Sequence, residues 1–291
     1  MPRKTHRRAH PRAAAHPKPA HQHTPHRHTT HPNAAGPHAA GRHELGQNFL
    51  VDPGVIADVV EHVAATEGPI LEIGPGDGAI TLPLARLGRP IRALEADPRR
   101  ADRLAARAPR RVRVEHADAL AHRFDAAPHV VVSNLPFHIT TAMLRRLLAA
   151  PGWTDAVLIA QWEVARRRAG VGGATQLTAQ SAPWFEFALV RRIPRQAYRP
   201  MPQVDGGLFS VRRRAQPLVP PAQRRDYAAM VARVFGSGGH GLARILPTAR
   251  VLPPQAAKRW LRDRGHAAGG LPRDLSPADW SDLWRAHRAS R

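Results

Sequence analysis

The stretch Leu71-Glu72-Ile73-Gly74-Pro75-Gly76-Asp77-Gly78 indicates the fold class of this chain. It opens with a short apolar run that predicts a buried strand, and its three glycines predict a tight turn into a helix. Glycines at such a turn let a ligand approach the backbone closely, and the N–H groups that open the helix favour an anionic or polar group. The stretch therefore predicts a ligand-binding loop at the end of the first strand of an α/β sheet.

Apolar strands alternate with amphipathic segments from Gly46 onward. Strands are predicted at Ile70–Ile73, Ile91–Glu95, Val112–Glu115, Val130–Ser133, Ala156–Ala160, Phe187–Val190 and Leu208–Val211. Helices are predicted at Val55–Ala65, Ile80–Leu87, Arg99–Ala106, Ala142–Ala149 and Glu163–Ala169. Alternation at this spacing is typical of right-handed βαβ units, so we predict a Rossmann-like α/β fold with a mostly parallel sheet. No helix fits between the last two strands, which we expect to pair antiparallel at the sheet edge.

The composition divides the chain into three parts. Residues 1–43 hold ten His, eight Lys or Arg and no Asp or Glu, and this Pro-rich, apolar-poor stretch predicts a disordered basic tail without metal-ligand spacing. Residues 44–214 form the predicted catalytic domain. After a proline-rich linker, residues 215–291 form a predicted helical RNA-binding domain. Its helices are predicted at Ala222–Phe235, Leu242–Leu246, Pro254–Arg264 and Pro277–Ala286, the last capped by Ser276 and with Trp280 and Trp284 in the core.

The charge of the chain indicates a polyanionic partner. It carries 44 Lys and Arg against 22 Asp and Glu, a formal net charge of +22, and the tail accounts for only +8 of it. Each phosphate contact releases condensed counterions, so such an excess favours nucleic acid. No basic amphipathic helix with an aromatic-rich apolar face and no run of about 18 apolar residues occurs, so we expect no membrane partner. The absence of cysteine excludes disulfides and thiolate sites and fits the cytoplasm.

The glycine loop alone leaves its ligand open. With Ala79 it satisfies the pattern G-x-G-x-x-G/A, and Glu95 lies about 20 residues on, where an acid would bind a ribose diol. NAD, S-adenosylmethionine and a turn that only packs a helix on a strand all fit. Asp118 follows the third strand, where it could accept from the exocyclic amine of a cofactor's adenine or simply cap a helix.

The stretch Asn134-Leu135-Pro136-Phe137, which follows the fourth strand, narrows the choice. The side-chain carbonyl of Asn134 and the backbone carbonyl of Leu135 could both accept hydrogen bonds from an adenine N6 amine, drawing the nitrogen toward tetrahedral geometry. Pro136 fixes φ and holds the turn, and Phe137 offers a face on which an extruded base can stack. These residues predict methyl transfer to an aromatic amine, driven mainly by in-line placement of amine and methyl group.

Together these motifs resemble the adenine-N6 rRNA methyltransferases, which comprise the Erm resistance enzymes and the housekeeping KsgA/Dim-type enzymes. The matching stretches are Gly46-Gln47-Asn48-Phe49-Leu50, Glu72-Ile73-Gly74-Pro75-Gly76, Glu95 with Asp118, and Asn134-Leu135-Pro136-Phe137. The resemblance implies that S-adenosylmethionine is held by Asn48, Leu50, Gly74, Glu95, Asp118 and Asn134, without a metal. It also implies that Asn134, Leu135, Pro136 and Phe137 serve catalysis, with Phe137 at the position of a stacking aromatic that is Tyr in many members.

Within this family the chain is more similar to the Erm branch. The stretches that carry this likeness are His43-Glu44-Leu45, Asn134 through Thr141, Tyr198 through Gly207 and Gly241 through Leu246. The resemblance implies mono- or dimethylation of an adenine in the peptidyl-transferase loop of 23S rRNA, with resistance to macrolides, lincosamides and streptogramin B. We expect a cytoplasmic monomer that acts on 23S rRNA before the ribosome is fully assembled. RNA capture is expected from basic residues near the crevice, namely Arg145, Arg146, Arg166 to Arg168 and Arg212 to Arg214.

Three alternatives remain at this point. A housekeeping enzyme would methylate adjacent adenines near the 3′ end of 16S rRNA. A nucleic-acid-binding relative would keep the fold without catalysis, although the intact set of cofactor residues argues against it. An NAD dehydrogenase would need a hydride-transfer constellation, and the sequence offers none.

Overall fold

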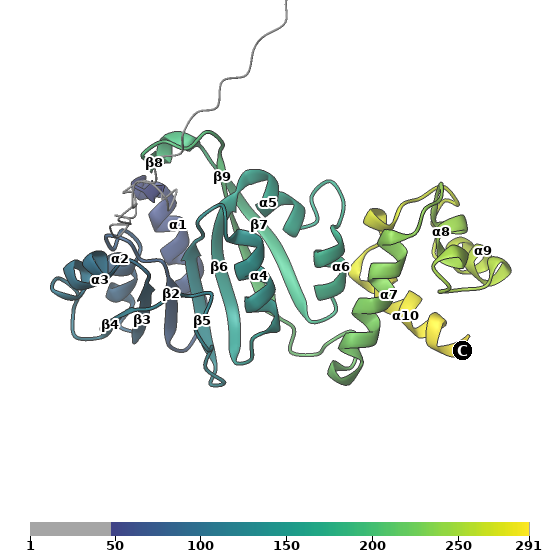
Figure 1. Ribbon diagram of the computed structural model, residues 1–291, viewed down its shortest axis with the longest axis horizontal. Helices are drawn as coiled ribbons and strands as arrows, with labels where there is room; N and C mark the ends of the chain where they lie inside the picture. The colour runs from purple at the N-terminus through teal and green to yellow at the C-terminus, as the bar shows by residue number, and fades with distance from the viewer. Residues whose placement is uncertain (1–47, 291) are drawn as a thin grey trace, which may run out of the picture. The chain divides into compact units, whose positions relative to one another are not determined.

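A seven-stranded sheet forms the centre of the computed structural model, which describes residues 48–290 (Figure 1). The strands are β2 (Ile70–Ile73), β3 (Ile91–Glu95), β4 (Val112–His116), β5 (His129–Asn134), β6 (Trp153–Gln161), β7 (Phe185–Ile193) and β9 (Gly206–Arg213). Their order across the sheet is β4-β3-β2-β5-β6-β9-β7. The tail at 1–43 and residues Gly46 and Gln47 of the first matching stretch lie outside the described residues.

The strand directions confirm the predicted fold class. The five strands β2 to β6 all run parallel to one another, whereas β9 runs antiparallel to both β6 and β7. The two last predicted strands therefore pair antiparallel at the edge, as expected. The chain moves outward from β2 to β3 and β4 and then returns to the other side of β2 with β5, so the strand order reverses between β2 and β5. Such a reversal opens a crevice at the carboxyl ends of the two strands.

Alternating side chains of the strands pack into two apolar cores, one on each face of the sheet. On one face, Ile73 and Val131 pack with residues of α4 such as Leu147. On the other face, Val130 packs with residues of α1 such as Val59. This alternation follows from the two-residue period of a strand and fixes which helix covers which face. The helices of this part are α1 (Pro53–Ala64), α2 (Thr81–Leu84), α3 (Pro98–Ala105), α4 (Thr140–Ala149), α5 (Trp162–Arg168) and α6 (Gln176–Ser181).

The chain after β9 is helical, as predicted, and packs against α6 and the end of the sheet (Figure 1). Its helices are α7 (Arg224–Gly236), α8 (Leu242–Thr248), α9 (Pro254–Asp263) and α10 (Pro277–Ala289). Ser276 caps α10 by accepting from the Asp279 N–H at 3.1 Å, and Trp280 and Trp284 are only 1% and 5% exposed, so both predictions are confirmed. The hydroxyl of Tyr227 on α7 donates to the Ala179 carbonyl at 2.9 Å and joins the helices to α6.

Short elements complete the fold, and the sequence analysis missed several of them. Strands β1 (Phe49–Leu50) and β8 (Tyr198–Arg199) pair antiparallel outside the main sheet and bring the segment after Asn48 to the Pro-rich loop before β9. Four 3₁₀ turns are η1 (Ala85–Leu87), η2 (Arg195–Ala197), η3 (Pro221–Gln223) and η4 (Pro272–Asp274). Elements of two to six residues show too little periodicity to be predicted. Among residues 48–290, no helix is both long and apolar enough to cross a membrane.

Candidate active site

A cavity of about 330 Å³ lies at the carboxyl ends of β2, β3, β4 and β5, where the strand order reverses. The residues lining it are Asn48, Phe49, Ile73, Gly74, Gly76, Leu94, Glu95, Ala96, Ala117, Asp118, Ala119, Leu120, Asn134, Leu135, Pro136, Phe137, His138 and Ile139. Every site residue expected from the sequence lines this cavity except Leu50, whose side chain is buried in the core against α1. The two motifs meet because β2 and β5 are neighbours, with Ile73 opposite Ser133.

The loop after β2 owes its path to its glycines. Gly74 and Gly76 have φ values of 69° and 57°, a region that L side chains rarely adopt. A Cβ on Gly74 would meet nothing within 4 Å, so open space lies beside its backbone, whereas one on Gly76 would lie 3.1 Å from the ring of Phe49. Gly74 thus leaves its backbone open to a ligand, and Gly76 makes room for Phe49.

Glu95 ends β3 as a buried carboxylate at the wall of the cavity. It is 2% exposed, and its Oε2 accepts from the Gly76 N–H at 2.9 Å while its Oε1 accepts from the Asp97 N–H at 3.0 Å. These two bonds hold the carboxylate in one orientation. Each oxygen keeps a second lone pair, so Glu95 can still accept from hydroxyl groups of a ligand.

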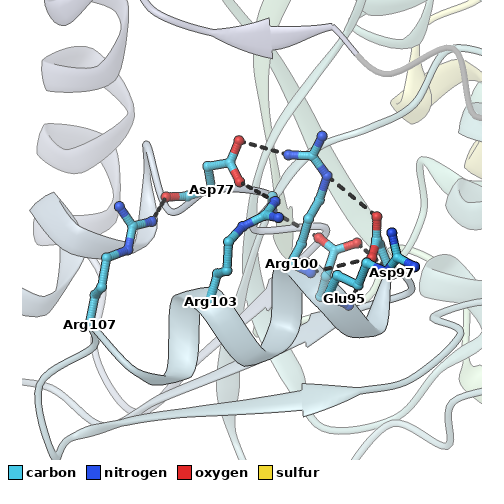
Figure 2. A network of polar contacts seen from close by, with 8 residues as sticks. Asp77, Glu95, Asp97, Arg100, Arg103 and Arg107 are labelled. Atoms are coloured by element: carbon cyan, nitrogen blue, oxygen red, sulfur yellow. Dashed lines mark hydrogen bonds and ion pairs between the residues drawn. The ribbon is translucent and has the colours of Figure 1, made fainter. Parts of the chain in front are cut away.

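Asp77, in the same loop, ties it to one side of α3 (Figure 2). Its Oδ2 lies 2.7 Å from Nη1 of Arg100 and its Oδ1 lies 3.3 Å from Nη2 of Arg103, while its backbone carbonyl accepts from Arg107 at 2.6 Å. Partial burial opposes ionisation of Asp77, but the hydrogen bonds and charges of Arg100 and Arg103 outweigh it and hold its pKa below the ordinary value. The guanidinium of Arg100 also lies 4.3 Å from the ring centre of Phe49. Side chains of α3 and of Arg107 just after it therefore fix the position of the loop.

Asn134 closes the opposite side of the cavity. Its Nδ2 donates to the Asn48 carbonyl at 3.0 Å, and because a carbonyl can only accept, this bond fixes which end of the amide faces Asn48. Within residues 48–290, nothing donates to the Asn134 Oδ1 or to the Leu135 carbonyl. The turn itself is closed, since the Pro136 carbonyl accepts from both the Ile139 N–H and the Thr140 hydroxyl at 3.1 Å. The motif therefore presents two unused acceptors.

Asp118 and Phe137 complete the wall. Asp118 is exposed after β4, and its Oδ1 accepts from the Leu120 N–H at 2.8 Å, so it caps the local turn and still lines the cavity. Phe137 is half-buried and leaves part of its ring accessible. The sequence analysis did not single out the apolar lining residues Leu94 and Ile139. Their apolar character alone does not distinguish them from core residues.

Glu72 lies in β2 beneath the loop and is 2% exposed. Among the described residues, its Oε2 has no hydrogen-bond partner. Burial raises the pKa of Glu72 to about 7, with the Thr81 hydroxyl opposing this shift and the nearby Glu95 carboxylate adding to it. The Glu72 carboxyl is therefore about half protonated near pH 7.

The donors and acceptors of the cavity fit an adenosine-type cofactor on one side and an amine on the other. The carboxylates of Glu95 and Asp118 can accept from hydroxyl and amino groups, and the open backbone at Gly74 leaves space for the rest of the cofactor. Asn134 and Leu135 can accept from an amine. Across residues 48–290, no group of three or more His, Cys, Asp or Glu side chains is arranged to hold a metal ion.

Comparisons with known proteins agree with this arrangement. Residues 38–251 match the family described as ribosomal RNA adenine dimethylase. The mycinamicin-resistance protein MyrB of Micromonospora griseorubida is 49% identical over 243 residues, which cover 83% of this chain and 78% of MyrB. An rRNA adenine N-6-methyltransferase of Corynebacterium diphtheriae is 53% identical over 201 residues, or 69% of this chain and 79% of that protein. The crystal structure of the 23S rRNA methyltransferase ErmE aligns with a TM-score of 0.76 and 32% identity, over 83% of this chain and 100% of ErmE.

Proposed function

We propose that this chain, which belongs to the ribosomal RNA adenine dimethylase family, methylates N6 of an adenine in 23S rRNA and so confers resistance to macrolides, lincosamides and streptogramin B. It is an S-adenosylmethionine-dependent rRNA adenine-N6 methyltransferase. The 23S target and the resistance are supported by the names of two similar proteins, the mycinamicin-resistance protein MyrB and the 23S rRNA methyltransferase ErmE. The observation that carries the proposal is the pair of unused acceptors at Asn134 and Leu135 in the cavity between β2 and β5.

The loop side of the cavity would hold the cofactor, which when bound supplies a methyl group on a positively charged sulfur. Glu95 would accept from the ribose hydroxyls, because its orientation is already fixed and each oxygen keeps a free lone pair. Asp118 would accept from the amine of the adenine ring. Gly74 and Asn48 would contact the remainder through their backbones. Leu50, which does not line the cavity, would act by supporting Asn48 through β1.

The motif side of the cavity would hold the target adenine. Asn134 Oδ1 and the Leu135 carbonyl would each accept one N6–H, which places the nitrogen lone pair toward the cofactor side. Pro136 would keep the turn rigid, and Phe137 would stack on the extruded base. The amine would lose its proton after methylation has made it cationic, so the mechanism requires no general base.

RNA would be captured by basic side chains of the catalytic domain, 44–214, and of the helical domain, 215–291. Several of the arginines expected to do this have a structural partner. Arg213 donates to the Trp153 and Ala150 carbonyls at 2.9 Å, and Arg146 donates to the His122 carbonyl at 2.7 Å. Arg145 is exposed and forms no ion pair with any residue in 48–290, which makes it the better candidate for a phosphate contact.

The need to extrude the target base bears on when the enzyme acts. An extruded base must leave its stack, which is easier in RNA that is not yet covered by ribosomal proteins. We therefore place the reaction on 23S rRNA before full assembly, in the cytoplasm, by a monomer, since one chain supplies both the loop side and the motif side of the active-site cavity.

The proposal is tested by mapping the methylated nucleotide on naked 23S and 16S rRNA with labelled S-adenosylmethionine, beside expression in a macrolide-sensitive bacterium. We expect label in one adenine of the 23S peptidyl-transferase loop and combined resistance to macrolides and lincosamides. Label in 16S rRNA without resistance would instead assign the chain to the housekeeping branch. Cofactor binding without transfer to either RNA would assign it to the non-catalytic relatives.

A further inference from the structure

A second cavity, of about 470 Å³, lies between the sheet and the C-terminal helices and shares no lining residue with the active site. Its walls come from α5, the loop after it, α6 and β7 on one side and from η4 and the start of α10 on the other. The loop between α5 and α6 reaches the helical part directly, because the Ala174 N–H donates to the Arg273 carbonyl at 2.8 Å. A cavity of this volume is large enough for a nucleotide-sized ligand.

The unmet hydrogen-bonding groups in this cavity are donors. Arg168, half-buried at the end of α5, donates through Nη1 to the Thr175 hydroxyl at 2.7 Å, but its Nε is buried without a partner. Trp280 is 1% exposed, and its Nε1 also has no partner. Buried donors without acceptors are costly, and both side chains that carry them line this cavity, so a ligand bound there would supply the missing acceptors.

The two carboxylates in the same walls are each paired with an arginine. The Glu186 carboxylate lies 2.6 Å from Nη1 of Arg214. Asp274 accepts from the Leu271 N–H at 2.8 Å and lies 3.8 Å from Nε of Arg273. Their charges are therefore compensated, whereas the donors of Arg168 and Trp280 are not.

Arg168 differs from Arg166 and Arg167 in having no carboxylate partner within residues 48–290. Arg166 lies 2.9 Å and Arg167 3.8 Å from the Glu163 carboxylate, whereas Arg168 forms no ion pair with a carboxylate anywhere in residues 48–290. Burial, followed by the nearby charges of Arg145 and Arg167, lowers the pKa of Arg168. An arginine without a carboxylate partner, surrounded by positive charge and partly removed from water, favours a bound anion.

We propose that this cavity binds a backbone phosphate of the substrate RNA, with Arg168 and Trp280 as its donors. The inference rests on the proposed function and adds a phosphate subsite that positions the RNA. The subsite is rigidly connected to the active site, since Asn134 of β5 pairs with Ile159 of β6, and β6 continues directly into α5, which ends at Arg168. The seven residues of α5 span about 10 Å, so the bound phosphate lies within a few nucleotides of the target adenine.

The test uses the full chain and a short hairpin from the 23S peptidyl-transferase loop. Arg168→Gln should raise the KM for this RNA roughly tenfold or more, because a charge-assisted hydrogen bond is lost, with kcat and cofactor affinity nearly unchanged. Arg168→Lys should recover part of the loss. Trp280→Phe keeps an aromatic ring against Phe235 but removes the five-membered part of the indole with its N–H, so its KM should rise about two- to tenfold. Thermal unfolding of this variant separates the lost N–H from a loss of packing. The control is Arg86→Gln, which removes one exposed charge on η1, outside both cavities, and should leave the KM nearly unchanged.

A set of hairpins, each with one neutral methylphosphonate linkage, then locates the phosphate. The wild-type enzyme should lose affinity at one linkage near the target, and Arg168→Gln should be insensitive to that same linkage. Equal sensitivity in both proteins, or an unchanged KM in both cavity variants, would overturn the subsite. Binding of inorganic phosphate at this cavity while the RNA is bound would assign it to a free anion and contradict the RNA contact. If the wild-type enzyme labels no RNA at all, the proposed function fails first, and the two failures are thereby distinguished.

Discussion

The two sides of the active-site cavity differ in whether their polar groups already have hydrogen-bond partners. On the loop side, Asp77 is held by arginines of α3, and both oxygens of Glu95 accept from backbone N–H groups. On the motif side, Asn134 and Leu135 keep carbonyl oxygens to which no residue in 48–290 donates. We propose that the loop side, whose polar groups are already held, binds the cofactor and that the motif side keeps its acceptors for the reacting amine.

In the proposed mechanism, the two sides of the cavity act at different stages. A fixed loop lowers the ordering cost of cofactor binding, because little has to move when the ligand arrives. Unused acceptors on a rigid turn act when the amine changes geometry, so their contribution is to the rate rather than to ground-state binding. Substitutions on the two sides should therefore change different measured quantities.

The largest effect is expected at Asn134. Asn134→Ala removes an acceptor for the target amine, which should lower the single-turnover rate by about 10²–10³, corresponding to about 3–4 kcal/mol. Asn134→Asp should also be poor, because a buried charge is costly to desolvate and could pair with the cofactor's positive sulfur instead. Transfer of labelled methyl groups to the 23S hairpin measures both rates. An alanine variant that methylates at close to the wild-type rate would refute the role given to the carbonyl.

Glu72, on the loop side, should affect stability and its pH dependence. Its pKa in the folded protein is raised from 4.5 to about 7, so the folded state binds the proton more tightly than the unfolded chain does. This contribution to stability is complete below pH 4.5 and declines as the pH rises to about 7, by about 3 kcal/mol in all. Glu72→Gln stays neutral and should lack this decline.

Urea unfolding of both proteins at pH 5 and pH 8 measures the difference. The Gln variant should gain about 2.5 kcal/mol in unfolding free energy relative to the wild type between pH 5 and pH 8. The carboxylates with lowered pKa titrate below this window and are shared by both proteins, so they cancel in the comparison. Parallel pH profiles would show that Glu72 is ionised throughout.

The next largest effect is expected at Glu95 and concerns cofactor binding. Glu95→Gln keeps the size of the side chain but replaces one accepting oxygen with a donor and removes the charge. The affinity for S-adenosylmethionine should fall by about 10- to 100-fold, the range for a hydrogen bond to a charged group. Calorimetry of cofactor binding measures this affinity, with Asp97→Asn as a control at a neighbouring half-buried carboxylate that caps α3 and does not line the cavity. Equal affinity in the wild type and the Gln variant would remove Glu95 from the cofactor site.

The smallest effects are expected at Phe137. Phe137→Ala should lose base stacking worth about 1–3 kcal/mol, seen as a higher KM for RNA and slower methylation. Phe137→Tyr keeps the ring face and should be nearly silent. Steady-state kinetics with the same hairpin distinguish the pair. If the Tyr variant is as impaired as the Ala variant, the size of the side chain at position 137 determines activity, rather than its stacking on the base.

Much of the fold could be predicted because the relevant patterns are local. The period of the strands, the glycines at 74 to 78 and the cap at Ser276 each act over a few residues, and the structure confirms the elements that they indicated. The helix α6 and the β1–β8 pair could not be predicted, because they are short and depend on contacts made across the chain.

Which residues line the cavity was largely predictable from the sequence, but their hydrogen bonds were not. The motif residues could be expected to line one crevice, since they follow neighbouring strands. The Asn134 side-chain amide donates to the Asn48 carbonyl, 86 residues earlier, and this hydrogen bond exists only in the folded chain. The same holds for the run Arg166 to Arg168, in which only the last residue lacks a carboxylate partner among those described. Sequence shows which groups are present, and the fold decides which of them remain unpaired.

The division between the two sides is tested most directly by measuring the single-turnover methylation rate against cofactor concentration for Asn134→Ala and Glu95→Gln together. Asn134→Ala should lower the maximal rate by about 10²–10³ with a smaller change in the half-saturating concentration. Glu95→Gln should raise the half-saturating concentration by about 10- to 100-fold while most of the maximal rate is kept. If both variants changed the same quantity to a similar degree, the two sides would not have separate roles.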